Sequence, residues 1–126
     1  MAFENVRNTV PALEAGEVLT TAQFKAVKMS TVANRVLLAT SLGERVIGIL
    51  QNKPSAIGQA ATVAVPGSTT KMVAGATVNP GAFVTTTATG LAITAVATNN
   101  VLGICLEGGA VNQLITVQLA DLGNAP

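Results

Sequence analysis

Few residues in this chain have the types and spacing that covalent chemistry requires, and the first are in the run Ser68-Thr69-Thr70-Lys71. The run fits the S-x-x-K pattern of serine acyl-transferases, whose lysine lies one helical turn from the serine in a large cleft between two domains. Here Pro66-Gly67 places the serine in a turn between strands, and the other motifs of those enzymes are missing. A hydrolase that uses Ser68 and Lys71 is therefore the least favoured hypothesis.

The second chemical pattern is Ala26-Val27-Lys28-Met29, which is close to the Ala-Met-Lys-Met of biotin carriers. Those carriers are also small duplicated β-domains, and they present the lysine in an exposed hairpin turn between symmetric halves. Lys28 lies early in the chain, inside a strand-like run, and Val27 replaces the first methionine. We interpret Lys28 as a strand lysine that points to solvent. A carrier or ligand-binding β-module that uses Lys28 remains the alternative hypothesis.

No other arrangement of residues suggests catalysis, a metal site or a cofactor. The chain has no histidine and a single cysteine, Cys105, so the usual metal-ligand sets cannot form. The carboxylates lie far apart along the sequence, with no close pair for acid–base work; they are Glu4, Glu14, Glu17, Glu44, Glu107 and Asp121. We therefore expect a protein that is not an enzyme and that binds no metal, cofactor or small-molecule substrate.

The distribution of charge argues against nucleic acid and membrane as partners. Seven Lys or Arg residues balance six Asp or Glu, and no basic cluster with interleaved aromatic residues occurs. The stretch from Met72 to Leu106 carries no charge, but glycine, proline and asparagine interrupt it before ~18 apolar residues accumulate. Residues 1–7 contain no apolar core of a signal peptide. We expect neither a membrane span nor an export signal.

The elements that would position any site come from an internal duplication. The run Val46-Ile47-Gly48-Ile49-Leu50 reappears as Val101-Leu102-Gly103-Ile104-Cys105, at an offset of 55. Residues 61–65 return as residues 115–119, and residues 15–19 align with residues 74–78 if a few insertions are allowed. Periods of this length are typical of repeated architectures. The sequence predicts two similar halves, at about 15–65 and 74–119.

The pattern within each half is that of an all-β protein, with short apolar runs separated by turn residues. Residues 113–119 alternate between apolar and polar side chains. Residues 46–50 and 101–106 are continuously apolar, which is typical of strands covered on both faces. Gly48 and Gly103 lie inside these runs and indicate a close backbone approach. We predict a small β-barrel or sandwich with two pseudo-symmetric halves and an extended N-terminal arm.

The domain boundaries follow from the extent of the repeat. Residues 1–14 lie outside it and show no clean period, so we expect an arm that is disordered or laid on a partner. Residues 15–126 would then form a single β domain. A core rich in valine and alanine buries little area per residue, which favours oligomerisation.

The order of these motifs resembles the small capsid cement (head decoration) proteins of tailed bacteriophages. The resemblance covers roughly residues 15–119 and rests on Val46–Leu50, Ala61–Gly67, Val101–Cys105 and Ile115–Leu119, together with Ala-Gly-Glu-Val near residue 16, Ala-Gly-Ala-Thr-Val near residue 75 and Pro-Gly-Ala-Phe-Val at 80–84. It implies a homotrimer on the outer capsid surface of the virion, synthesised in the host cytoplasm, that clamps neighbouring major capsid subunits.

The leading hypothesis is therefore a structural cement that binds the major capsid protein and stabilises a phage head. A free arm could add a strand to an exposed capsid edge through backbone hydrogen bonds. Its candidate capsid contacts are the apolar Phe3, Val6 and Val10 and the charged Glu4 and Arg7.

Overall fold

A computed structural model describes residues 2–6, 9–10 and 12–125, and within these residues the chain forms ten strands and no helix. The predicted all-β barrel or sandwich is confirmed. Nothing in the described part has the helix length and apolar character that crossing a membrane would need. The strands are β1 (Glu14–Ala15), β2 (Ala26–Met29), β3 (Arg35–Leu38), β4 (Gly48–Leu50), β5 (Val63–Ala64), β6 (Thr69–Val73), β7 (Phe83–Thr86), β8 (Ala92–Thr94), β9 (Gly103–Glu107) and β10 (Leu114–Leu119).

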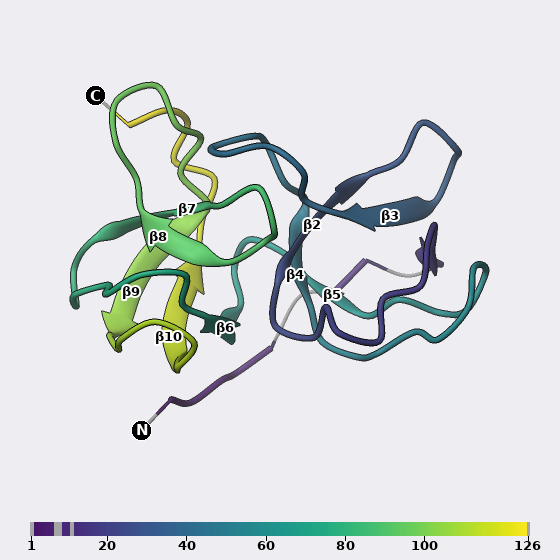
Figure 1. Cartoon of the computed structure of the whole chain (residues 1–126), viewed down its shortest axis with the longest axis horizontal. Coiled ribbons are helices and arrows are strands. Elements are labelled where there is room, and N and C mark those ends of the chain that lie inside the picture. The colour runs from purple at the N-terminus through teal and green to yellow at the C-terminus, as the bar shows by residue number, and fades with distance from the viewer. Residues whose placement is uncertain (1, 7–8, 11, 126) are drawn as a thin grey trace.

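The strands form two five-stranded sheets that follow one another along the chain and lie side by side (Figure 1). The first has the order β1-β3-β2-β4-β5 and the second the order β6-β10-β9-β7-β8. A short connection, residues 65–68, leads from the last strand of the first sheet to the first strand of the second. The sequence order of the elements therefore places one half of the repeat in each sheet.

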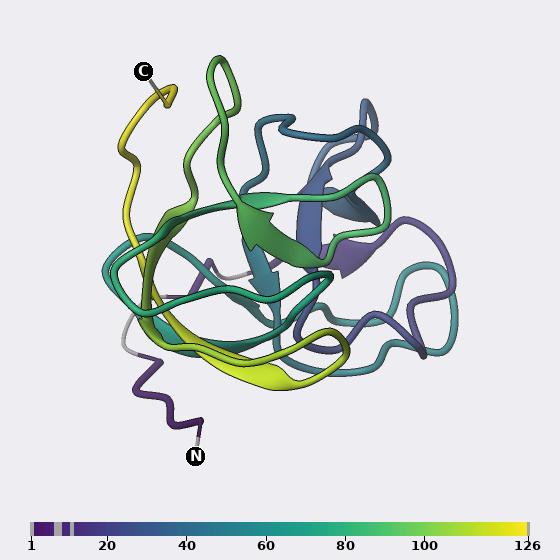
Figure 2. The ribbon, with the colours of Figure 1, turned by 60° about the vertical axis from the view of Figure 1, so that its left-hand side comes forward.

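Both sheets curl until their outer strands approach each other, and the curl of the second is evident in Figure 2. In the first sheet, Glu14 pairs with Ala60, just before β5, while β1 also pairs in parallel with β3. In the second, β6 pairs with β10, and Ala74 pairs in parallel with Ala92 of β8. Followed around the curl, the strands have the same neighbours in both halves.

Individual backbone hydrogen bonds also recur in matching positions. The Ala15 amide donates to the Gln59 carbonyl over 2.8 Å, and the Ala74 amide donates to the Gln113 carbonyl over 2.9 Å. The division into an arm of residues 1–14 and a β domain of residues 15–126 stays a prediction. Leu13 is already buried and Glu14 begins β1, so the packed part starts slightly before residue 15.

The apolar core consists of two clusters that share the first sheet. Ile49 and Leu50 are neighbours on β4 and point to opposite faces, one into each cluster. One cluster fills the first half, with Leu13, Leu19, Val27, Val36, Leu50 and Val63 among its members. The other joins both sheets and includes Ala26, Ala39, Ile49, Ala64, Met72, Val84, Cys105, Ile115, Val117 and Leu119. The halves are thus one packed body.

The apolar runs that contain β4 and β9 differ in how they are covered. Gly48, Ile49 and Leu50 are all buried, as predicted for a strand covered on both faces, whereas Val46 and Ile47 of the same run are half-buried. The same prediction is wrong for the second run, because Ile104 is half-buried and Leu106 is 45% exposed. The first sheet has its second face covered by the other half, whereas the second sheet leaves Phe83, Leu106 and Leu114 exposed.

Gly48 and Gly103 lie at places where backbone meets backbone. A Cβ at Gly48 would lie 2.0 Å from the Ala64 carbonyl oxygen, and one at Gly103 would lie 2.3 Å from the Gln118 carbonyl oxygen. Neither oxygen belongs to a flexible side chain, so a larger residue forces the strands apart.

We predict that Gly48→Val and Gly103→Val each lower the free energy of unfolding by about 1–3 kcal/mol, because overpacking displaces a paired strand. Urea unfolding measures this. Thr62→Val, at an exposed position just before β5, serves as the control and should change stability by less than about 0.5 kcal/mol. Unchanged midpoints for both glycine variants would show that the close approach is not required.

Candidate functional site

The described residues of the N-terminal arm, 2–6 and 9–10, lie beside the connection between the two sheets (Figure 1). The Asn5 amide donates to the Thr69 carbonyl over 2.7 Å, and Thr9 pairs with Ala64. Val6 packs against the core cluster that joins both sheets, and Val10 packs against the other cluster. The arm thus lies on its own chain, where it covers the place at which one half passes into the other.

Two of the arm's remaining predicted contact residues, Phe3 and Glu4, are exposed. Phe3 is 49% exposed, with its amide donating to the Thr116 hydroxyl over 2.9 Å, and Glu4 is also exposed. Arg7 lies outside the described residues. The assignment of these residues to a capsid contact stays a prediction, and within the described part of the arm it now depends on Phe3 and Glu4, because Val6 and Val10 face the protein's own core.

Lys28, the residue of the carrier hypothesis, lies in the middle of β2 and not in a hairpin turn. Its ammonium lies 3.5 Å from the Glu44 carboxylate and donates a hydrogen bond to the Thr40 hydroxyl. Glu44 in turn accepts hydrogen bonds from the amides of Thr40 and Ser41 over 2.6 and 3.1 Å. A lysine held in this way is poorly presented to a modifying enzyme.

The same contacts set the titration of Glu44. Partial burial raises the pKa of its carboxyl group, but the hydrogen bonds from the Thr40 and Ser41 amides and the nearby Lys28 ammonium outweigh burial. The net pKa is lower than the ordinary value of 4.5. The Glu44 carboxyl group is therefore charged at neutral pH, and its contact with Lys28 fastens β2 to the segment after residue 40.

Ser68 and Lys71 do not form an acyl-transferase site. Ser68 is buried before the start of β6, whereas Lys71 lies in β6 on its more exposed face, 5.9 Å from the centre of the Phe24 ring. A strand turns side chains three residues apart to opposite faces, so the helical-turn geometry that this chemistry needs is absent. Cys105 is buried, and burial raises the pKa of its thiol, which makes it unreactive.

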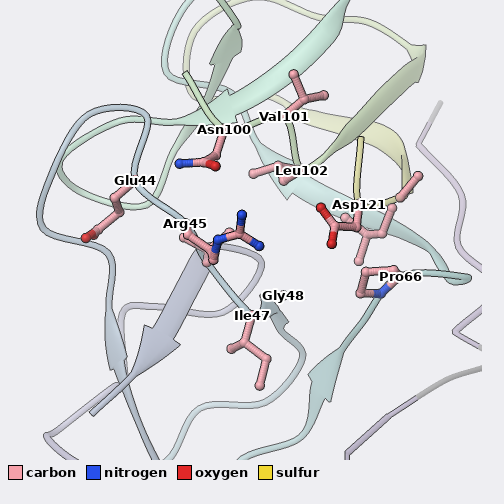
Figure 3. A pocket seen from close by; sticks show the side chains of 12 residues that line it. Glu44, Arg45, Ile47, Gly48, Pro66, Asn100, Val101, Leu102 and Asp121 are labelled. Carbon is pink, nitrogen blue, oxygen red and sulfur yellow. The ribbon is translucent and has the colours of Figure 1, made fainter. Parts of the chain in front are cut away.

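A pocket of about 190 Å³ lies at the surface between the two halves (Figure 3). Its walls come from matching segments of the repeat, residues 44–48 and residues 100–102, together with Pro66 and residues 119–121. Apolar side chains of Ile47 and Leu102 line it, and both residues are half-buried.

Two opposite charges face each other across this pocket. Figure 3 shows the Arg45 guanidinium directed into the pocket from one wall and the Asp121 carboxylate from the other. Both residues are exposed. Neither side chain forms an ion pair with any residue that the structure describes. No motif of the sequence marks Arg45 as a candidate. The repeat could have indicated it, because Arg45 aligns with Asn100 and a charged residue therefore replaces a neutral one at equivalent positions.

No protein-family model matches the sequence, and no curated protein matches it. Among solved structures, the fold is similar to the crystal structure of the head fiber gp8.5 N base in bacteriophage phi29, with a TM-score of 0.65. The similarity covers 90% of this chain and 94% of that chain, at 14% sequence identity. At such low identity the match establishes a shared fold.

The Glu44 contacts generate a prediction about pH. A carboxyl group whose pKa is lowered by folding stabilises the folded state above its unfolded pKa, and this contribution is lost as the pH falls through the folded pKa. Glu44→Gln should therefore lower the free energy of unfolding by roughly 0.5 kcal/mol at pH 7, and the difference should shrink below about pH 4.5.

Urea unfolding at pH 7 and pH 3 tests this, with the exposed Glu4→Gln as the control that should show no such difference. An equal effect of Glu44→Gln at both pH values would mean that the carboxylate charge does not contribute.

Proposed function

We propose that this protein is a structural component of a phage head that binds the major capsid protein on the outer capsid surface and stabilises contacts between its subunits. The observation that carries the proposal is the shared fold with a phage head fiber base over nine-tenths of both chains. That fold supports attachment to a head, and the sequence resemblance to cement proteins supports the finer role.

The contacts of the arm are consistent with this role. A head-bound protein needs apolar side chains that are presented to a partner, and Phe3 is half-exposed at the start of an arm whose backbone is already held in place by Asn5 and Thr9. Holding the backbone beforehand reduces the entropy lost on binding. The arm then supplies a preformed contact, with Phe3 as an apolar anchor and Glu4 beside it.

The carrier hypothesis is the alternative, and the structure disfavours it because Lys28 is engaged by Glu44 and Thr40. A carrier would show a covalent adduct on Lys28, visible as a mass shift of the protein purified from its host.

We predict that Phe3→Ala weakens binding to expanded phage heads by about tenfold, since a buried aromatic anchor often supplies this much affinity. Cosedimentation with purified heads measures it. The matched control is Ile57→Ala, which removes an exposed apolar side chain from a distant loop and should leave binding unchanged. Point variants are preferable to deletion of the arm, because deletion also removes Val6 and Val10 from the core. Full binding by Phe3→Ala would place the attachment elsewhere.

We also expect a homotrimer, because the resemblance implies one and because the second sheet presents Phe83 and Leu106 to the outside. Light scattering should give three times the chain mass, or electron microscopy of decorated heads should show three-lobed density. Single lobes on the heads together with a monomer in solution would contradict the trimer.

A further inference from the structure

Two short segments, residues 44–47 (the first edge segment) and residues 99–102 (the second edge segment), occupy equivalent places in the two halves. Each immediately precedes the central glycine of its half. The matching backbone hydrogen bonds are those from the Ile47 amide to the Val27 carbonyl, 2.9 Å, and from the Leu102 amide to the Val84 carbonyl, 2.9 Å. The two segments can therefore be compared group by group.

The second edge segment is covered by the C-terminal tail, residues 123–125. The tail adds to it as a short antiparallel strand, with Asn100 opposite Asn124. The bonds are from the Val101 amide to the Gly123 carbonyl, 2.7 Å, from the Ala125 amide to the Asn99 carbonyl, 2.9 Å, and from the Thr98 amide to the Ala125 carbonyl, 3.2 Å. The backbone of this segment is thus largely satisfied within the chain.

The first edge segment has no such cover. The carbonyl of Glu44, the amide and carbonyl of Arg45 and the amide of Val46 form no hydrogen bond with any residue that the structure describes. Arg45 is exposed and Val46 is half-buried, so water can reach the segment. A row of unpaired amides and carbonyls is a template on which another strand can pair.

The cause of this difference is the path of the chain after β5. In the second half, the chain continues from Leu119 through Asp121 into the tail. In the first half, it turns at Pro66-Gly67, with Gly67 at a φ of 105°, and enters β6 of the other sheet. The pocket between the halves is bounded by Pro66 and by the first edge segment. It therefore lies where a counterpart of the tail would begin.

We propose that the first edge segment is a strand-addition site that takes an extended segment of a partner protein, with small side chains and one acidic side chain. Strand addition gives affinity through main-chain hydrogen bonds, while side-chain pockets give specificity. The tail that fills the equivalent place consists of Gly123, Asn124 and Ala125, and a pocket of about 190 Å³ likewise accepts small side chains.

Charge selects the acidic residue and its position. The Arg45 guanidinium is directed into the pocket without an ion-pair partner among the described residues, and a carboxylate is the group that its planar fork binds best. Asp121 on the opposite wall would repel a carboxylate placed beside it. The acidic side chain must therefore lie on the Arg45 side, which fixes the register of the added strand.

The donor is another protein and not the arm or the tail of a second copy, because both of these segments are engaged within their own chain. The tail is bound to the second edge segment, and the arm pairs with Thr69 and packs Val6 into the core. If the donor is taken to be a protein of the phage head, that identification rests on the proposed function, whereas the strand-addition site does not.

The test uses the full chain and a capped synthetic peptide, Ala-Asp-Leu-Gly-Asn-Ala, which copies residues 120–125. Hydrogen exchange followed by NMR reports each amide. Without peptide, the Arg45 and Val46 amides should exchange about 100-fold faster than those of Asn100 and Val101, because unpaired amides are the least protected. At saturating peptide, exchange at Arg45 and Val46 should slow about tenfold.

Arg45→Glu should weaken peptide binding about tenfold, since it replaces an attraction by a repulsion. Lys53→Glu makes the same charge change at an exposed site outside the pocket and should alter binding less than about twofold. If both variants have the melting temperature of the unchanged protein, their folding is intact. A peptide with N-methylated amides, which cannot pair as a strand, should not bind.

Two results would overturn the proposal. One is an absence of peptide protection at Arg45 and Val46 in a folded protein; the other is protection that rises with protein concentration alone, which would make a second copy the occupant. Head binding is read separately. If the peptide binds but the full chain does not bind heads, strand addition stands and the head assignment fails. If Arg45→Glu binds heads as tightly as the unchanged protein and the peptide gives no protection, strand addition fails and the head assignment stands.

Discussion

The close approach of backbone to backbone at Gly48 and Gly103 is the constraint on which the rest of this structure depends. At both places a carbonyl oxygen of the neighbouring strand occupies the space where a Cβ would be. Such contact lets a short strand bend across its neighbour, so each five-stranded sheet can curl until its outer strands meet. The position of residues 44–47 and 99–102 follows, because each segment leads directly into its glycine.

Small side chains make the junction of the halves possible and limit its strength. Ala26, Ala39 and Ala64 of the first half pack into the cluster that also holds the interior of the second half. Alanine permits close contact between sheets but contributes little buried area, at about 25 cal/mol per Å² of apolar surface removed from water. The arm adds Val6 to this cluster and Val10 to the cluster of the first half, so it acts first as a part of the fold and only then as a surface for a partner.

The sequence was sufficient for the features that are local or repeated. Alternation predicted the strand near residue 115, glycine inside an apolar run predicted the close approach at residue 48, and turn residues predicted the all-β class. Solvent exposure of Leu106 was not predictable, because an apolar run has the same pattern whether a second sheet or a separate molecule covers it. The facing charges of Arg45 and Asp121 were not predictable either, because distant parts of the chain meet there only after both sheets have curled.

The two halves of this chain differ in one respect. In the second half, the segment that follows the last strand folds back and covers the edge segment of that half. In the first half, the corresponding segment has to connect to the second sheet, so it cannot cover its own edge segment. The turn at Pro66-Gly67 makes that connection, and the tail of residues 123–125 covers the edge segment of the second half. Two nearly equal halves therefore present unequal edges, and an assembly built on the uncovered edge would contain one guest strand for each chain.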